Sequence, residues 1–207
     1  MQAGDTDQRS DEELMTAYAG GEAECFAVLV RRHGAALLGY LRRYSGDVAA
    51  AEDLFQETFR RVHERAGSYT GSGKFRGWLY TVATNVALDG YRKQQRRRRW
   101  GKTVSLQQLR SKDGEASPES TVAVEDNATI GPQDQADLAE QQRLVRGAIA
   151  QLPEKQRATL VLAYYEKLSY KEIAEILKCS VGAVKTHMFR AVRALAQMLP
   201  VEVRPER

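Results

Sequence analysis

Residues 169–190 read SYKEIAEILKCSVGAVKTHMFR, and this stretch decides the fold of the C-terminal part of the chain. Ser169 with Glu172 is a capping-box pattern, which opens a helix, and Ser180 can cap a second helix. Ala174 is small enough to let two crossing helices approach closely. Apolar residues for the seam between them follow at Ile173, Leu177, Val184 and Met188. The stretch therefore predicts a helix-turn-helix.

The second helix of this motif presents small and cationic side chains to solvent. They are Ser180, Val181, Gly182, Lys185, Thr186 and Arg190. Such groups near the N-terminus of a helix can enter a major groove, where they contact phosphates and base edges. The pattern therefore indicates a DNA reader, although an ordinary helical hairpin with a solvated basic face has the same pattern.

The rest of the chain shows apolar stripes with the period of an α-helix. A capping box at Ser10 and Glu13 opens a first short helix, Asp47 can cap a later one, and Pro153 stands where it can start another. Longer stripes run along residues 26–44, 51–62, 75–86 and 138–152. Because no segment shows the alternation of a strand, we expect an all-α protein made of two small helical domains.

The charge is unevenly distributed along the 207 residues, which carry 31 Lys and Arg against 27 Asp and Glu. Residues 1–30, 31–66, 67–112, 113–140 and 141–207 have net charges of −6, +2, +10, −8 and +6. Two basic blocks separated by an acidic one suggest two anion-facing modules and a spacer. Residues 113–137 lack both basic residues and sustained periodicity, which predicts a flexible acidic linker.

Composition excludes several classes of protein. The 43% hydrophobic content supports a packed core, but no apolar run is long enough to cross a membrane. The acidic N-terminus is not a secretory signal. Cys25 and Cys179 cannot form a disulfide scaffold, and they are interpreted as small core residues of a protein in the reducing cytosol. His33, His63 and His187 have no metal-ligand spacing, so no metal site is assigned.

The basic stretch after residue 67 predicts a second nucleic-acid surface. Asn85, Asp89 and Arg92 share one face of the predicted helix, and aromatic and cationic side chains cluster at its start. That cluster is Phe75, Arg76, Trp78 and Tyr80. Aromatic rings beside cations suit unstacked single-stranded bases. Phe75 and Trp78 equally fit the apolar stripe as core residues, and Arg96–Arg99 is interpreted as a solvated phosphate-binding tail.

Three ordered blocks carry a resemblance to a known family. They are AEDLFQETF at 51–59, FRGWLYTVATN at 75–85 and LPEKQR at 152–157, which leads into the helix-turn-helix. The chain resembles the extracytoplasmic-function (ECF) sigma factors of the bacterial sigma-70 family. The resemblance covers nearly everything except the linker and the termini, and it implies a transcription initiation factor without catalytic activity or cofactor.

The resemblance implies an organisation and a set of partners. Residues 10–97 look like sigma region 2, residues 98–137 like a basic-then-acidic linker along the RNA exit path, and residues 138–199 like region 4. The implied partners are core RNA polymerase, contacted at its beta-prime clamp helices and beta flap, promoter DNA, and an anti-sigma factor. The implied location is the bacterial cytoplasm, without membrane insertion.

Site residues follow from the resemblance position by position. Core polymerase would be bound by Asp53, Gln56, Glu57 and Phe59, although Asp53 and Glu57 also fit an exposed helix face paired with Arg60 and Arg61. The Gly71–Trp78 segment and the following helix would capture the −10 strand through Phe75, Arg76, Trp78, Tyr80, Asn85, Asp89, Arg92 and Lys93. The −35 element would be read by Ser180, Val181, Gly182, Lys185, Thr186 and Arg190.

The sequence departs from the family at two points and leaves two alternative functions open. The acidic linker at 113–137 is long for the family. Lys178 stands where a helix-turn-helix usually has glycine, and a positive φ there would cost about 1 kcal/mol, which leaves room for a locally different turn. A two-domain repressor acting without polymerase would not need the Asp53–Phe59 face. An enzyme is disfavoured because the sequence offers no phosphate loop or clustered catalytic residues.

Overall fold

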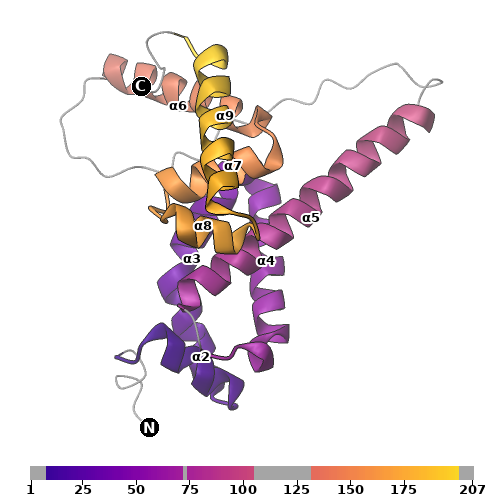
Figure 1. Cartoon of the computed structure of the whole chain (residues 1–207). Helices are drawn as coiled ribbons and strands as arrows, with labels where there is room; N and C mark the ends of the chain where they lie inside the picture. Colours follow the sequence, from indigo (N-terminus) through magenta and orange to yellow (C-terminus); the bar gives the residue numbers. More distant parts are fainter. Residues whose placement is uncertain (1–7, 72–73, 105–131, 201–207) are drawn as a thin grey trace.

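The computed structural model describes residues 8–71, 74–104 and 132–200. Within these ranges every regular element is helical, which confirms the all-α prediction (Figure 1). The bounds are α2 Asp11–Ala19, α3 Ala23–Ser45, α4 Val48–Glu64, the 3-10 helix η1 Ala66–Ser68, α5 Phe75–Val104, α6 Pro132–Gln151, α7 Glu154–Tyr164, α8 Tyr170–Ile176 and α9 Val181–Met198. No helix in these ranges has the length and hydropathy to cross a bilayer.

Side chains cap four of the helices, as the sequence predicts. At α2 the Ser10 hydroxyl accepts the N–H of Glu13, whose carboxylate accepts the Ser10 N–H at 2.8 Å. Ser169 begins α8 with the same reciprocal box. Asp47 accepts the first-turn N–H of α4, and Ser180 does so for α9. These oxygens satisfy N–H groups that have no partner within their own helix, which fixes where each helix starts.

The N-terminal unit, α2–α5, is assembled around α3. Helix α3 packs against α2, α4 and α5, and α4 packs against α5. The predicted stripes form the core: Leu29, Leu37, Leu41, Val62, Leu79, Val82 and Val86 are all buried. Helix α5 continues past residue 97, where a domain boundary was expected, to Val104, and its C-terminal part projects from the body (Figure 1).

The C-terminal unit, α6–α9, contains the predicted helix-turn-helix. Ile173, Leu177 and Val184 are buried in the seam between α8 and α9, and Met188 packs against it half-buried. Helix α6 begins at Pro132, six residues before the expected boundary at 138. The predicted acidic linker at 113–137 lies largely outside the described residues, which resume at 132.

The turn of the helix-turn-helix contains a residue in the left-handed backbone conformation. Lys178 has φ 49°, although it is not glycine. The N–H of Cys179 donates to the Ala174 carbonyl at 3.0 Å and that of Lys178 to Glu175 at 3.3 Å. This pair of bonds is the Schellman motif, which ends a helix through one left-handed residue. The lysine therefore accepts the strained backbone rather than changing the turn.

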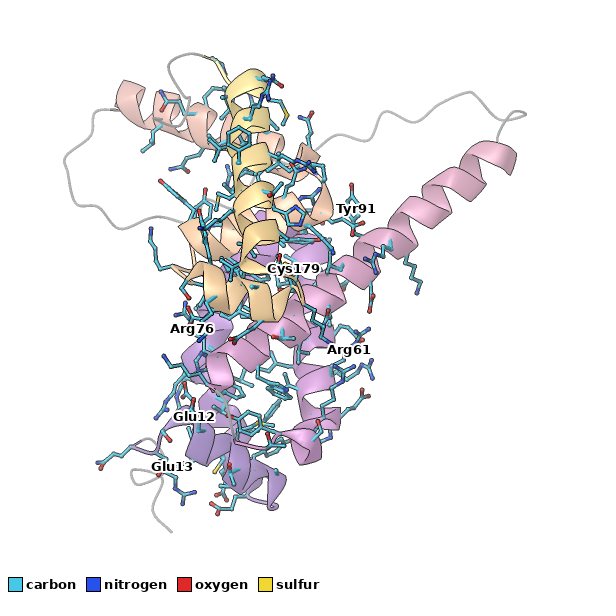
Figure 2. All side chains as sticks on the ribbon, viewed as in Figure 1. Glu12, Glu13, Arg61, Arg76, Tyr91 and Cys179 are labelled. Atoms are coloured by element: carbon cyan, nitrogen blue, oxygen red, sulfur yellow. The ribbon has the colours of Figure 1, made fainter. Side chains whose placement is uncertain are left out.

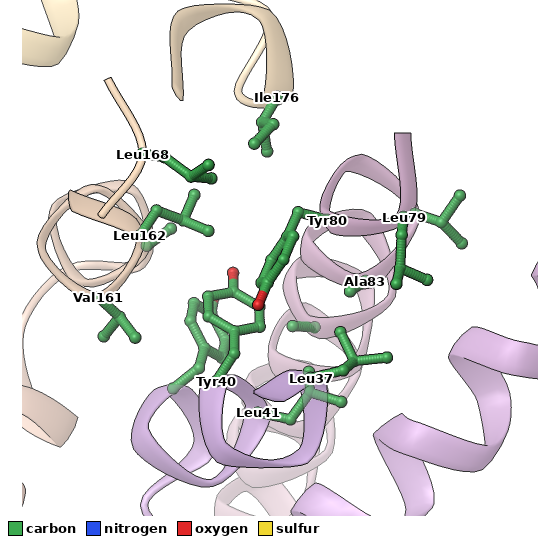
Figure 3. Close-up of a cluster of buried hydrophobic side chains, with 14 of the residues drawn as sticks. Leu37, Tyr40, Leu41, Leu79, Tyr80, Ala83, Val161, Leu162, Leu168 and Ile176 are labelled. Carbon is green, nitrogen blue, oxygen red and sulfur yellow. The ribbon is translucent and has the colours of Figure 1, made fainter. Parts of the chain in front are cut away.

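The two units pack against each other in one continuous core. Helix α3 contacts α6 and α7, and α5 contacts α8. Figure 3 shows part of this shared cluster of buried side chains. It includes Leu37, Tyr40, Leu41 and Tyr80 from the N-terminal unit and Val161, Leu162, Leu168 and Ile176 from the C-terminal unit. The sequence predicts two units but contains no signal for this docking.

Candidate nucleic-acid and polymerase interfaces

The outer face of α4 carries the residues expected to bind polymerase. Asp53 and Gln56 are exposed. The Glu57 carboxylate accepts bonds from Arg60 at 2.7 Å and from Arg61 Nε at 2.8 Å. The hydrogen bond from Arg60 and then that from Arg61 lower the pKa of Glu57 to about 2. Asp53 and Gln56 are therefore the most accessible members of the set, while Glu57 is half-buried and already paired on its own helix.

Phe59 is the buried member of this set. Its side chain is 7% exposed, and its ring lies 5.0 Å from Phe55 and 5.9 Å from Phe26, measured between centroids. A buried ring cannot touch a partner directly in this conformation. Phe59 holds α4 against α3 and supports the outer face from behind.

The start of α5 combines buried rings with an exposed cation. Phe75 is buried, and its N–H donates to Glu12 Oε1 at 2.8 Å, which ties α2 to the first turn of α5. Tyr80 is also buried, whereas Trp78 is half-buried beside Tyr69, with 5.3 Å between ring centroids. Of the four residues predicted here, Arg76 is the exposed one.

Farther along α5, the predicted strand-binding residues reach the surface. Asp89, Arg92 and Lys93 are exposed and Asn85 is half-buried. Asp89 Oδ2 lies 3.3 Å from Arg61 Nη1, so the α4 and α5 faces are linked by an ion pair. Both helices can thus present one joint surface to a partner.

The predicted DNA-reading face of α9 is open to solvent. Val181, Gly182, Lys185, Thr186 and Arg190 are all exposed, and Ser180 caps the helix with 3.1 Å between its Oγ and the Ala183 nitrogen. The Thr186 hydroxyl donates to the Gly182 carbonyl at 3.0 Å. The buried side of α9 is formed by Val184, Ala191 and Leu195. The face opposite the core therefore carries every residue of the predicted −35 set.

This face also carries Phe189, which is not among the residues predicted from the sequence. The Phe189 side chain is 66% exposed, although phenylalanine is usually buried. It stands four residues after Lys185 and three after Thr186, so it shares their face. This spacing places Phe189 outside the apolar stripe of α9. The sequence alone could therefore have indicated that Phe189 is exposed on the DNA-reading face.

The two cysteines differ in burial. Cys25 is completely buried, and burial raises the pKa of its thiol. Cys179 is half-buried beside the turn before α9 and is labelled in Figure 2. Within the described ranges, no group of three or more His, Cys, Asp or Glu side chains is placed to hold a metal ion.

Comparisons with known proteins agree with this geometry. Residues 29–97 match the family Sigma-70 region 2, and residues 142–195 match Sigma-70, region 4. The RNA polymerase sigma-H factor of Pseudomonas aeruginosa is 29% identical over 196 residues, which cover 93% of this chain and 95% of that protein. The ECF RNA polymerase sigma factor SigW of Bacillus subtilis is 32% identical over 179 residues, covering 86% and 91%.

Two solved structures share the fold. CnrH, solved in complex with the cytosolic domain of CnrY, has a TM-score of 0.62 at 23% identity, covering 91% of this chain and 96% of that one. The sigma factor RpoE, solved with the anti-sigma factor NepR from Bartonella quintana, has a TM-score of 0.60 at 20% identity, covering 86% and 98%.

The chain belongs to the ECF sigma factors of the sigma-70 family. It functions as an RNA polymerase sigma factor, which is a transcription initiation factor rather than an enzyme. The alternative of a repressor that acts without polymerase is not favoured. From here on, the N-terminal unit is called region 2 and the C-terminal unit region 4.

Proposed function

We propose that the two units divide promoter recognition between them. Region 4, within residues 138–199, reads the −35 duplex with α9, and region 2, within residues 10–97, binds core polymerase through α4 and holds the −10 strand along α5. Residues 98–137 connect them along the RNA exit path. The observation that carries this proposal is the exposed face of α9, since a helix-turn-helix presents this face to a major groove.

On α9, different side chains have different tasks. Lys185 and Arg190 supply charge for phosphates or hydrogen bonds to guanine. The first turn, with Val181 and Gly182, offers N–H groups that lack partners within the helix and can bind a phosphate. Phe189 supplies an apolar surface of the kind that contacts a thymine methyl group.

Salt-dependent DNA binding tests these assignments. Lys185→Ala or Arg190→Ala should weaken binding to a −35 duplex and reduce the slope of log Kd against log salt by about one, because a phosphate contact is lost. Phe189→Ala should leave the slope unchanged and relax the preference for thymine at one position. Arg146→Ala, an exposed cation on α6, is the matched control. Unchanged slopes for both lysine and arginine variants would mean that α9 does not face DNA.

Region 2 would dock on the beta-prime clamp helices through α4. Support comes from the exposure of Asp53 and Gln56 and from the acidic charge, which suits an arginine-rich partner surface. Asp53→Lys should weaken binding to core polymerase about tenfold, whereas Glu24→Lys, an equal charge change on α3, should not. Equal effects of the two variants would point to net charge rather than to a docking face.

The −10 strand would lie along α5. Arg76, Arg92 and Lys93 supply charge for the backbone, Trp78 supplies a ring for a base, and Asn85 and Asp89 line the path. Phe75 and Tyr80 support this surface from the core rather than contacting DNA. The region 4 unit would additionally contact the beta flap.

A protein inhibitor is a further proposed partner. CnrH and RpoE were each solved bound to another protein, and the protein bound to RpoE is named an anti-sigma factor. Affinity purification of this chain from its native cells should recover core polymerase subunits in one fraction and a stoichiometric inhibitor in another. Recovery of polymerase alone, under inducing and non-inducing conditions, would contradict an inhibitor.

A further inference from the structure

The N-terminus of α5 is held by a side chain from another helix. The carboxylate of Glu12, on α2, accepts the N–H of Phe75 at 2.8 Å, and Phe75 is the first residue of α5. The first N–H groups of a helix have no partner within it, and the helix dipole favours a negative charge beside them. Glu12 is half-buried and is labelled in Figure 2. Its carboxylate therefore fixes where the first turn of α5 lies.

This first turn carries a cluster of three aromatic rings. Between ring centroids, Phe75 lies 6.2 Å from Tyr69 and 6.0 Å from Trp78, and these two rings lie 5.3 Å from each other. Phe75 is completely buried, whereas Tyr69 and Trp78 are half-buried. The two outer rings thus rest on Phe75. A shift of the first turn of α5 would move Trp78, the ring assigned above to a base.

Helix α2 is itself fixed to α3 at this point. Asp11 accepts a bond from Arg32 Nη1 at 2.7 Å, and its other carboxylate oxygen lies 2.7 Å from His33 Nε2. The His33 ring in turn lies 5.3 Å from the Phe75 ring, measured between centroids. The adjacent acids Asp11 and Glu12 therefore tie α3 and the start of α5 to the same turn of α2.

Helix α2 also packs against the segment that precedes α5. It contacts η1, and a Cβ built on Gly71, which has φ 67°, would stand 3.8 Å from Thr16 Oγ1. Burial raises the pKa of Tyr69, and the charges of Glu12 and Asp11 raise it further, so both carboxylates are near this ring. Helix α2 therefore supports both the chain before α5 and the first turn of α5.

The charge of Glu12 is unfavourable for binding DNA. Residues 67–112 have a net charge of +10, which suits a polyanion, but a carboxylate beside them repels a phosphate backbone. By charge alone, removal of Glu12 should tighten the binding of single-stranded DNA. If Glu12 fixes the aromatic cluster, its removal should instead weaken the recognition of a base. The two roles predict opposite results.

We propose that Glu12 is a positioning residue for capture of the −10 strand. By holding the first N–H of α5, it keeps Phe75 and Trp78 in the arrangement on which a base stacks. This inference rests on the proposed assignment of the −10 strand to α5. It extends that function to α2, which precedes the residues 29–97 that match region 2.

Binding of −10 oligonucleotides to the holoenzyme tests this role. Core polymerase carrying the full chain is titrated with a fluorescent single strand of the −10 sequence and with strands in which each base in turn is replaced by an abasic site. In the wild type, loss of the stacked base should weaken binding about tenfold. In Glu12→Ala this factor should fall below about threefold, because the ring is no longer held in place. The abasic strand should bind this variant at least as tightly as it binds the wild type.

Two further substitutions at Glu12 separate the hydrogen bond from the charge. Glu12→Gln removes the charge but keeps an oxygen that can accept the Phe75 N–H, so it should restore most of the base discrimination. Glu12→Asp keeps the charge but shortens the reach to Phe75, so it should lose discrimination as Glu12→Ala does. The Asp variant also keeps the test valid if the Ala variant folds poorly.

Glu13→Ala is the matched control for stability. The Glu13 carboxylate accepts the Ser10 N–H at 2.8 Å and so caps α2 itself. Its loss should lower the midpoint of thermal unfolding while leaving the discrimination near tenfold.

The outcomes distinguish positioning from the underlying function. Wild-type discrimination in both Glu12→Ala and Glu12→Asp, or an equal loss in Glu13→Ala, would overturn the positioning role. Equal weakening of intact and abasic strands, as a general loss of folding would cause, would also overturn it. If no abasic site weakens binding to the wild-type holoenzyme, the proposed capture of a −10 base by this segment is itself contradicted.

Discussion

At the scale of single residues, burial separates side chains that the sequence leaves equivalent. The family resemblance places Phe59 in the polymerase-binding set, and the clustering of aromatic rings with cations places Phe75 and Tyr80 in the −10 set. The structure buries all three. These three rings are buried because α2, α3 and region 4 pack against them. The local sequence pattern does not indicate such tertiary packing. The cationic and acidic members of the predicted sets were easier to place, because charged side chains seldom lie inside.

Two buried tyrosines should respond differently to loss of their hydroxyl groups. Tyr40 bonds to Thr84 at 2.9 Å, whereas the Tyr44 hydroxyl has no partner among the described residues. Tyr40→Phe should lower the free energy of unfolding by about 1 kcal/mol, and Tyr44→Phe should leave it unchanged or raise it by a similar amount. Urea denaturation of both variants decides between these signs. A larger loss of unfolding free energy in Tyr44→Phe than in Tyr40→Phe would contradict the hydrogen bonding described for these two hydroxyl groups.

Three buried tyrosines predict that stability is lost at alkaline pH. Burial raises the pKa of Tyr40, Tyr44 and Tyr80 above the ordinary value of 10.0. The folded state therefore favours the protonated form, and the stability present below pH 10 is lost as the unfolded chain ionises above it. The free energy of unfolding should fall by about 1.4 kcal/mol per pH unit for each tyrosine. A flat profile from pH 9 to 11 would rule this out, and Tyr44→Phe should reduce the slope.

At the scale of helices, capping residues and apolar stripes were sufficient to predict most elements. The starts at Ser10, Asp47, Ser169 and Ser180 were all correct, because a cap satisfies N–H groups locally. The ends of α5 and the start of α6 were less predictable, since arginine-rich and acidic segments lack an apolar stripe. Pro132 at the first position of α6 was an available signal that was read as part of the linker.

The turn of the helix-turn-helix should become more stable with glycine. Lys178 has φ 49°, a conformation that costs a residue with a Cβ about 1 kcal/mol. Lys178→Gly should therefore raise the free energy of unfolding by up to about 1 kcal/mol, or the Tm by roughly 2–4 °C. Lys171→Gly, inside α8, is the control and should destabilise by a similar amount. Destabilisation by both variants would contradict the strained turn.

At the scale of the whole molecule, the docking of region 4 on region 2 could not be predicted from the sequence. The interface combines a shared apolar core with polar residues such as Arg157 and Glu166, whose partners lie far away in the chain. The apolar stripe of a helix indicates which of its faces is buried. It does not indicate which other helix packs against that face. The charge blocks did not indicate the docking either, because residues 67–112 and 141–207 are both net basic, at +10 and +6.

Arg92 provides a test of how the assembled factor opens DNA. Arg92→Ala should reduce the yield of open complexes about threefold to tenfold while leaving the affinity for core polymerase intact, because a strand contact on α5 is lost. Permanganate reactivity of promoter thymines measures the yield. Arg92 Nε also lies 3.6 Å from the carboxylate of Glu154 on α7, and Glu154→Gln breaks this ion pair without altering α5, so it should not lower the yield. Equal losses in both variants would assign Arg92 to the contact with region 4 alone.

Promoter-directed transcription measures the sigma-factor activity of this chain itself. Purified core RNA polymerase from the source organism is mixed with this chain and with fragments of its own genome, and the start sites are mapped. We expect new transcripts that depend on this chain and begin downstream of a shared pair of −35 and −10 elements. We also expect Asp53→Lys and Lys185→Ala each to reduce them. The absence of stimulated transcripts from any fragment, with polymerase active in a control reaction, would contradict this activity.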